Sequence, residues 1–251
     1  MRVSEIYTIL DTISPFDFQE KWDNSGLLIG SFEDSFDAIF VCLDLSLSLL
    51  EDIPNNSLII THHPIIFSPF NKLNFNDLSS KLIKQIIKKD IKVIALHTNF
   101  DKSHLNDYVG SDILEFEKLS NENFIFQTRY DGDFASLFEH ISSKLNLSSK
   151  KVTLSKDILD KKSINIALCT GSGMSLLSSL SDEIDCFLTG DIKYHDANEA
   201  IARNISLIDI GHYESEIHFE DIMLEILQKE ILKTNYKDMQ IKPLGSVCPF
   251  T

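Results

Sequence analysis

Apolar runs of strand length alternate along this chain with segments of helical period, and this alternation constrains the fold more than any other feature. Most predicted strands are continuous apolar runs, as expected of strands buried on both faces. They cover residues 38–43, 57–61, 91–96, 124–129, 164–169, 185–189 and 205–210. Amphipathic helices are predicted over 77–89, 133–146 and 213–232. Strands and helices in this order predict an α/β architecture.

The size of the chain allows two domains. Its 251 residues, 43% of them hydrophobic, can bury a full core in one large domain or in two smaller ones. The polar stretch 117–123 interrupts the pattern and predicts a boundary between two halves of similar size. We therefore expect an N-terminal half over residues 1–118 and a C-terminal half over 119–251, whose last segment can pack back on the first half.

The charge of the chain excludes some partners. Its 23 basic and 38 acidic residues give a net charge of −15, which repels phosphate backbones and acidic membranes and argues against nucleic acid as a partner. No run approaches the ~20 apolar residues of a membrane span, and the first residues lack the apolar core of a signal peptide. We therefore expect a cytoplasmic protein with no membrane partner.

The cysteines form no C-x-x-C pair, and three of them, Cys42, Cys169 and Cys186, lie inside apolar, strand-like runs. A free cysteine in such a run packs as a small hydrophobe. We expect these three to be buried, reduced thiols, and Cys248 stands outside the predicted strands.

Histidines gather at the ends of predicted strands, where α/β proteins build their sites. His62 and His63 follow strand 57–61, which ends there because Pro64 has no N–H to donate to a ladder. Successive side chains of an extended chain point to opposite sides, so adjacent histidines suit two neighbouring ions better than one. The alternative is a pair of hydrogen-bonded loop residues.

A second cluster, His97 and Asp101, follows strand 91–96. Asp101 offers a hard oxygen ligand and His97 a borderline nitrogen ligand, a mixture that suits zinc, manganese or iron. Alternatively, Asp101 caps a helix that begins near Leu105.

A third cluster follows strand 205–210. A helix that starts there places His212 and Glu216 four residues apart on one face, which resembles half of a zinc-binding helix. The alternative is an acid of the first turn that complements the helix dipole, a role that suits Glu214 better than Glu216.

A fourth cluster, Asp191 and His195, follows strand 185–189. These groups could orient ligands or shuttle protons, or they could belong to a helix cap with exposed charges. Four clusters of imidazole and carboxylate groups, each after a predicted buried strand, make coincidence a poor explanation. The sequence therefore predicts a metal site.

Two loops carry less information. The glycine loop 170–173 matches neither a P-loop nor a dinucleotide fingerprint, so a tight turn is favoured over an anion site. The stretch 22–27 has a turn signal and one large aromatic residue, Trp22, and predicts a structured loop.

Several stretches occur together in a specific order: WDNSGLLIG at 22–30, CLDLS at 42–46, ITHHPIIF at 60–67, ALHTNFD at 95–101, GDIKYHDA at 190–197 and GHYESE at 211–216. Together they resemble the dinuclear-metal family of GTP cyclohydrolase 1 type 2 homologues, also called NGG-one-interacting-factor-three-like proteins. The match runs from residue 22 to residue 216 and covers most of the chain.

The resemblance implies a ligand set for two divalent ions per chain: His62 and His63 as paired ligands, Asp101 as a carboxylate ligand, and His212 and Glu216 as closing ligands. His97 lies beside the site in that pattern, as a further ligand or as a group that orients ligands. The resemblance also implies two related α/β halves with mixed sheets flanked by helices, the metal site between them, and a homohexameric ring. The chain resembles the short form, without a central insert.

Two metal ions close together activate a water for hydrolysis. The resemblance implies opening of the purine ring of GTP, with a nucleotide or a phosphorylated small molecule as the partner, although no base-stacking or base-edge motif is visible in the sequence. A metallophosphatase would use the same ligands. A metal-binding adaptor or regulatory protein is the alternative from another class, and it needs no open coordination position.

Overall fold

The structure is a computed structural model that describes residues 1–122, 124–147 and 151–249. The chain forms two compact units: unit 1 contains Met1–Phe100 and His218–Thr251, and unit 2 contains Asp101–Ile217. The polar stretch 117–123, where the sequence predicts a boundary, lies within unit 2. Its polar character has a local explanation, because β5 (Ser120–Glu122) is the edge strand of a sheet.

Unit 1 has a five-stranded mixed sheet, in which β1 is antiparallel to β4 and the other neighbours are parallel. In spatial order the strands are β1 (Gly26–Ile29), β4 (Lys92–Ala95), β3 (Ser57–Thr61), β2 (Ala38–Cys42) and β11 (Gln240–Pro243). The three central strands are the fully buried ones and were predicted from their apolar runs. The partly exposed β1 and β11 lie at the edges and were not predicted.

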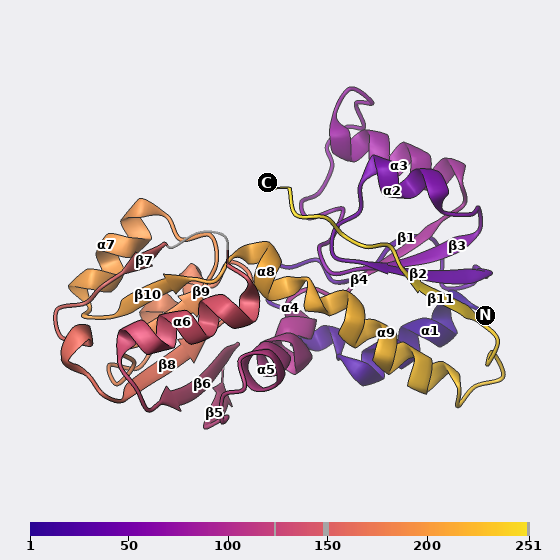
Figure 1. The fold of residues 1–251 in the computed structure, drawn as a ribbon. Helices are drawn as coiled ribbons and strands as arrows, with labels where there is room; N and C mark the ends of the chain where they lie inside the picture. The colour runs from indigo at the N-terminus through magenta and orange to yellow at the C-terminus, as the bar shows by residue number, and fades with distance from the viewer. Residues whose placement is uncertain (123, 148–150, 250–251) are drawn as a thin grey trace. The chain divides into compact units, whose positions relative to one another are not determined.

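Helices cover both faces of this sheet. Figure 1 shows α2 (Leu47–Asp52) and α3 (Leu78–Lys88) on one face, and α1 (Val3–Ile13) and α9 (His218–Ile231) on the other. Strand residues that include Phe40, Ile59 and Val93 pack in one apolar cluster with Leu50 of α2 and Leu82 of α3. A short helix, η1 (Phe16–Phe18), precedes β1.

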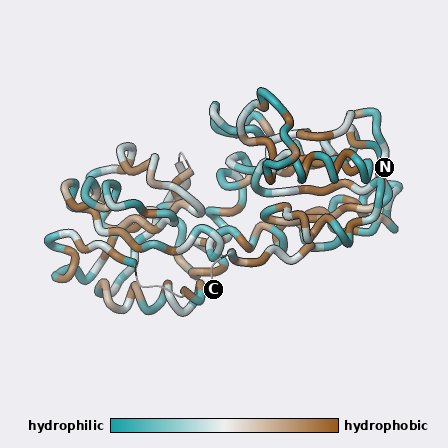
Figure 2. Tube along the Cα trace, turned by 90° about the horizontal axis from the view of Figure 1, so that it is seen from above, coloured by the Kyte–Doolittle hydropathy of each residue, from teal (hydrophilic) through white to brown (hydrophobic). Residues whose placement is uncertain are grey.

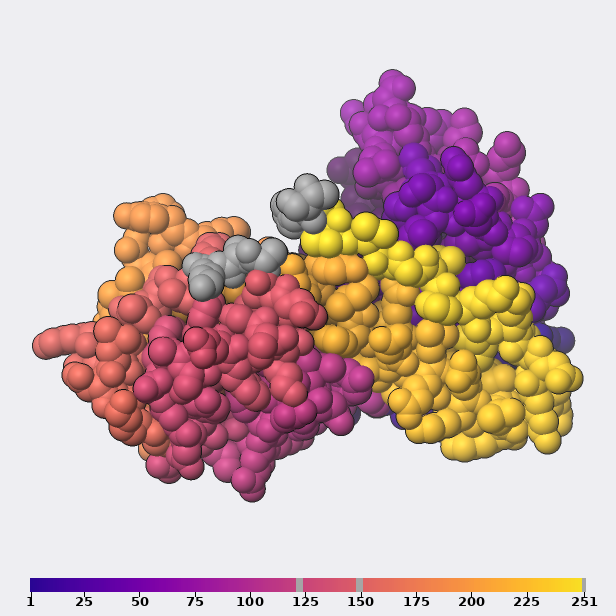
Figure 3. Space-filling model, in the orientation of Figure 1, coloured from indigo at the N-terminus to yellow at the C-terminus, as the bar shows by residue number. Residues whose placement is uncertain are grey.

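The C-terminal segment completes unit 1, and its yellow atoms lie against the N-terminal part of that unit in Figure 3. Strand β11 pairs in parallel with β2. Glu220 of α9 is buried and accepts hydrogen bonds from the backbone N–H groups of Gly245, at 3.0 Å, and Ser246, at 2.8 Å. The carboxylate thereby fixes the chain that follows β11.

Unit 2 has a six-stranded mixed sheet. In spatial order its strands are β5, β6 (Ile125–Tyr130), β8 (Ile164–Leu168), β9 (Cys186–Thr189), β10 (Ser206–Asp209) and β7 (Val152–Thr153). Strands β8, β9 and β10 run parallel, and the outer pairings are antiparallel. The prediction of an α/β fold with mixed sheets flanked by helices is therefore confirmed.

The helices of unit 2 include α6 (Phe134–Leu145), α7 (Tyr194–Ala202) and α8 (His212–Glu216), with short turns η4 (Ile158–Asp160) and η5 (Met174–Ser179). Figure 1 shows α6 in front of the sheet, and Ala200 of α7 packs in an apolar cluster with Phe187 and Leu207 of the strands. Helical turns run without a break through α4 (Thr98–Phe100), η2 (Asp101–Leu105), α5 (Asn106–Tyr108) and η3 (Val109–Ile113). Asp101 therefore lies inside a helical stretch and does not cap a helix that begins near Leu105.

Figure 2 shows hydrophobic stretches, in brown, in both units. Cys42, Cys169 and Cys186 are buried, and the four cysteines, all within the described residues, form no disulfide. Burial raises the pKa of each of these three thiols above its usual value, so they stay protonated near neutral pH. In the described part of the chain, no helix combines the length and the apolar character that crossing a membrane requires.

Candidate metal centre

The carboxyl ends of the parallel strands in unit 1 bring histidines together. His62 and His63 directly follow β3, and their N–H groups donate to the carbonyl oxygens of Cys42 and Leu43, both at 3.1 Å. The pairing of β3 with the β2 segment thus continues through both histidines. His97 follows β4, the neighbour of β3 on the other side, so parallel pairing sets it at the same edge.

Each of the three imidazoles is oriented by an acceptor at its Nδ1 atom. Nδ1 of His62 donates to the carbonyl oxygen of Leu96 at 2.9 Å. Nδ1 of His63 donates to Oδ1 of Asp44 at 2.9 Å, and Nδ1 of His97 donates to Oδ1 of Asp23 at 2.7 Å. A proton on Nδ1 leaves the lone pair on Nε2, which is the form of imidazole that a metal requires.

The three rings also lie close to one another. One ligand atom from each of His62, His63 and His97 lies within 4.8 Å of the other two. The ring centroids of His62 and His63 are 5.0 Å apart, and that of His97 lies 5.3 Å from His62 and 5.5 Å from His63. This histidine group of unit 1 has the nitrogen donors and the spacing to hold a metal ion.

The loop before β1 supplies the acceptor of His97, which is Asp23. The Asp23 side chain has no exposed surface, and its carboxylate accepts from His97 and from both the N–H, at 3.1 Å, and the hydroxyl, at 2.5 Å, of Thr98. Burial alone raises the pKa of Asp23, but the hydrogen bonds from His97 and Thr98 outweigh it and hold that pKa well below its usual range. Asp23 is therefore a carboxylate that fixes the His97 ring.

In unit 2, α8 brings His212 and Glu216 together as its sequence spacing predicts. Nδ1 of His212 donates to Oδ2 of Asp191 at 2.6 Å, and Nε2 of His212 lies 3.0 Å from Oε2 of Glu216. The His212 ring therefore lies between two carboxylates. An imidazole nitrogen and a carboxylate oxygen this close form a mixed donor set that suits a metal ion.

The glycine loop 170–173 supports Glu216. The N–H of Gly171 donates to Oγ of Ser215 at 3.0 Å, and the N–H of Gly173 donates to Oγ1 of Thr189 at 2.8 Å. These amides are occupied within the protein, so the loop is a turn, as favoured from the sequence. Gly171 has a φ of +61°, and a Cβ there would lie 1.9 Å from Oε1 of Glu216. Only glycine leaves room for this carboxylate.

Asp101 and Glu216 are both buried, and both lie near Cys169 in unit 2. Burial, and then the negative charges of these two carboxylates, raise the pKa of the Cys169 thiol. Among the described residues, the groups of unit 2 that could hold a metal ion are Asp101, His212 and Glu216, and Cys169 is not one of them.

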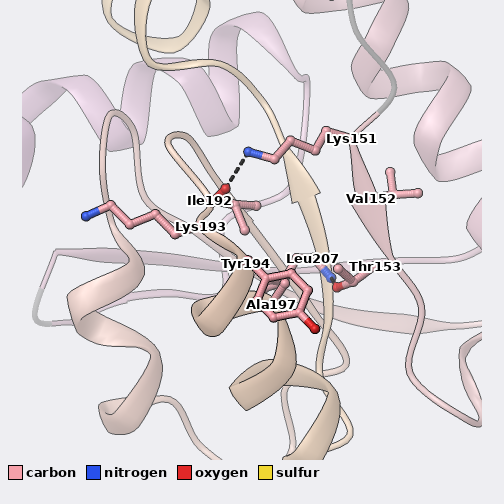
Figure 4. Close-up of a pocket in the computed structure, with 8 residues that line it drawn as sticks. All are labelled: Lys151, Val152, Thr153, Ile192, Lys193, Tyr194, Ala197 and Leu207. Carbon is pink, nitrogen blue, oxygen red and sulfur yellow. Dashed lines mark hydrogen bonds between the residues drawn. The ribbon is translucent and has the colours of Figure 1, made fainter.

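The two remaining candidates of unit 2 differ in position. Asp191 contacts His212, whereas His195 lies on the exposed side of α7 with its ring 5.4 Å from that of Tyr194. A separate pocket of about 300 Å³ is lined by Lys151, Val152, Thr153, Ile192, Lys193, Tyr194, Ala197 and Leu207, none of which is a predicted ligand. Figure 4 shows the Lys151 ammonium group donating to the Ile192 carbonyl, and Asp209 also accepts from it at 2.9 Å.

The sequence assigned no role to Asp23 or Asp44, and it assigned Gly171 only to a tight turn. The first two stand in the stretches WDNSGLLIG and CLDLS, which contributed to the resemblance without a physical role. A carboxylate within a structured loop, or directly after a buried strand, was the available signal.

Comparisons with known proteins identify the family of this chain. A family model described as Duf34/NIF3 (NGG1p interacting factor 3) matches residues 1–243. A Campylobacter jejuni protein named GTP cyclohydrolase 1 type 2 homolog is 41% identical over 228 residues, which cover 91% of this chain and 92% of that protein. A Helicobacter pylori protein named GTP cyclohydrolase 1 type 2 is 41% identical over 226 residues, which cover 90% of this chain and 91% of that protein.

Solved structures share the fold. Staphylococcus aureus protein SA1388 matches with a TM-score of 0.79 at 24% identity, covering 100% of this chain and 99% of that one. A Bacillus cereus protein described as related to NIF3 matches with a TM-score of 0.80 at 18% identity, over 100% of this chain and 99% of that one. At these identities the likeness concerns the fold.

Proposed function

Since this chain belongs to the Duf34/NIF3 family, as its motifs led us to expect, we propose that it is a dinuclear metal-dependent hydrolase that acts on a guanine nucleotide. The names of the Campylobacter and Helicobacter relatives suggest GTP as the substrate. The proposed ligands of the two ions are His62, His63, Asp101, His212 and Glu216.

The observation that carries this proposal is the orientation of the imidazoles. His62, His63 and His212 each have an oxygen acceptor at Nδ1, at 2.6–2.9 Å, which fixes the ring so that Nε2 is the atom presented to a metal. Histidines that merely fill a loop have no need of a common tautomer. The alternative of hydrogen-bonded loop residues explains each contact separately but does not explain this shared pattern.

In the proposed site, some residues would bind the ions and others orient the ligands. The imidazole nitrogens and the carboxylates of Asp101 and Glu216 would hold the ions. Two divalent ions held there would activate a water and polarise substrate oxygens, which is the chemistry that a hydrolase needs. Leu96, Asp44, Asp23 and Asp191 hold the rings in place.

Metal analysis and turnover test this function together. Protein purified without chelators should carry about two divalent ions per chain. His63→Ala and Glu216→Ala should each lose at least one ion, whereas His195→Ala, at an exposed imidazole, should retain both. Wild-type protein should hydrolyse GTP with added Mn²⁺ or Zn²⁺, and Asp101→Ala should not.

Each contrary result removes a part of the proposal. Wild-type protein without bound metal would exclude the metal centre. Equal turnover by wild type and Asp101→Ala would exclude the enzyme, and turnover of phosphomonoesters without GTP would indicate a metallophosphatase. Two tightly held ions without any turnover would indicate a metal-binding adaptor.

We also propose, as the resemblance implies, that the chain assembles as a homohexamer. Light scattering on purified protein should then give a mass near six times the 28.5 kDa of one chain. A mass of one or two chains would exclude that assembly.

A further inference from the structure

Two large aromatic side chains stand exposed beside the histidine group of unit 1. Trp22 is 57% exposed and Phe67 is 51% exposed, and their ring centroids are 5.9 Å apart. Both rings also lie near His97, with centroid distances of 6.2 Å for Trp22 and 6.3 Å for Phe67, and both meet the imidazole steeply. Trp22, Phe67 and the imidazole of His97 thus form an aromatic corner next to the proposed nitrogen ligands.

The backbone beneath the aromatic corner is held by side-chain hydrogen bonds. Nδ2 of Asn24 donates to the Ile66 carbonyl at 2.5 Å, which joins the loop of Trp22 to the segment of Phe67. Asp23, the residue between Trp22 and Asn24, binds His97 and Thr98 through its buried carboxylate. The backbone that carries Trp22 and Phe67 is therefore held in place by these hydrogen bonds, and both rings are exposed on it.

Exposed aromatic rings on a fixed frame are suited to stacking. Indole and phenyl faces stack on nucleobases with little loss of conformational entropy, because each side chain has few rotatable bonds. Other exposed rings of unit 1 have different neighbours: Phe32 packs edge-on against Tyr7, and the ammonium group of Lys84 lies over Phe75. Trp22 and Phe67 differ from Phe32 and Phe75 because both lie against the ring of His97.

We propose that Trp22 and Phe67 bind the purine base of the substrate by stacking and hold it beside the metal ions. The choice of a guanine nucleotide as the occupant rests on the proposed function. In that reaction the bond to be hydrolysed lies within the base, so the base itself must reach the activated water. A stacking surface in contact with His97 meets this requirement, whereas an enzyme that cleaves a phosphate ester would place phosphate there.

The sequence offers a direct readout, since Trp22 is the one tryptophan of the chain. Its fluorescence in metal-loaded, full-length protein reports on this ring alone. Acrylamide should quench the emission of the ligand-free protein, because the indole is exposed. GTP should quench it further with saturation, whereas inorganic tripolyphosphate, which has no base, should not.

Phe67→Leu keeps the reporter and removes half of the stacking surface. It should weaken GTP binding by about 5- to 150-fold, since stacking on an aromatic side chain contributes ~1–3 kcal/mol per base. Phe32→Leu removes a similarly exposed ring, 45% against 51%, and should bind GTP as wild type does. Both variants should carry the metal content of the wild type.

The proposal is overturned if acrylamide does not reach Trp22, which would mean that another copy of the chain covers the ring. It is also overturned if tripolyphosphate quenches as GTP does, or if Phe67→Leu binds GTP like the wild type. Turnover measured in the same samples separates this inference from the proposed function. GTP hydrolysis without quenching rejects the stacking surface alone, and saturable quenching without hydrolysis rejects the hydrolase alone.

Discussion

Oδ1 of Asp23 lies 2.7 Å from Nδ1 of His97, and the Asp23 side chain is completely buried. The two residues are 74 positions apart in the sequence, so this contact joins the loop before β1 to the end of β4. A buried carboxylate behind an imidazole fixes the tautomer and the direction of the ring, and it raises the basicity of the other nitrogen.

Asp23→Asn should therefore weaken metal binding by unit 1. Loss of a group that orients a ligand costs ~10–100-fold in metal affinity. The amide also has one acceptor oxygen where the carboxylate has two, so a donor among His97 and Thr98 loses its acceptor at a cost of about 1–3 kcal/mol in the free energy of unfolding. Metal titration and denaturant unfolding of the metal-free protein measure the two effects. Asp37→Asn, at an exposed aspartate that accepts from Asn56, is the control and should change neither.

Asp44→Asn should have a smaller effect than Asp23→Asn. Asp44 accepts from Nδ1 of His63 at 2.9 Å, but its side chain is 65% exposed, so solvent screens its charge and the loss of that charge matters less. We expect a loss of metal affinity of less than 10-fold and an unchanged midpoint of unfolding. An affinity loss equal to that of Asp23→Asn would show that burial of the carboxylate does not matter.

The strands that could be predicted from the sequence are those buried on both faces. Strands β2, β3 and β4 of unit 1 read as continuous apolar runs because each lies between two layers of helices. Edge strands have no such pattern: β11 is largely exposed, β5 is polar, and β7 has only two residues. Their positions follow from pairing with a neighbour, which a local pattern does not contain.

The residues of the candidate site also fall into those that could be predicted from the sequence and those that could not. Histidines could be assigned because they directly follow buried parallel strands, whose carboxyl ends share an edge. The groups that orient them could not, since Asp23 reaches His97, and Gly171 reaches Glu216, only after distant segments have packed. The stacking role of Trp22 was missed for the same reason, because its partner Phe67 lies in another loop.

Asp191→Asn tests the support of His212 in unit 2. Asp191 has a φ of +55°, a conformation that asparagine adopts readily, so the substitution removes charge without straining the backbone. Its Oδ2 accepts from His212 at 2.6 Å, and we expect metal affinity to fall by ~10-fold or more while thermal stability is unchanged. Isothermal titration with Zn²⁺ or Mn²⁺ measures the change. His195→Ala, in the same cluster of the sequence, should bind as the wild type does, and equal losses in the two variants would contradict the assigned geometry.

Gly171→Ala should disrupt the metal centre through sterics alone. An added Cβ would lie 1.9 Å from Oε1 of Glu216, and the backbone φ of +61° is unfavourable for alanine. Gly245→Ala is a matched control, because Gly245 has a φ of +71° but nothing lies within 4 Å of its added Cβ. Gly245→Ala should cost roughly 1–2 kcal/mol in the free energy of unfolding, from the left-handed conformation alone, and should keep the metal. Gly171→Ala should cost a further ~1–3 kcal/mol from overpacking and should lose at least one ion, because Glu216 must move away. Denaturant unfolding and metal analysis of both variants measure these effects. Equal unfolding free energies and equal metal contents in Gly171→Ala and Gly245→Ala would mean that the close contact between Gly171 and Glu216 does not shape the site.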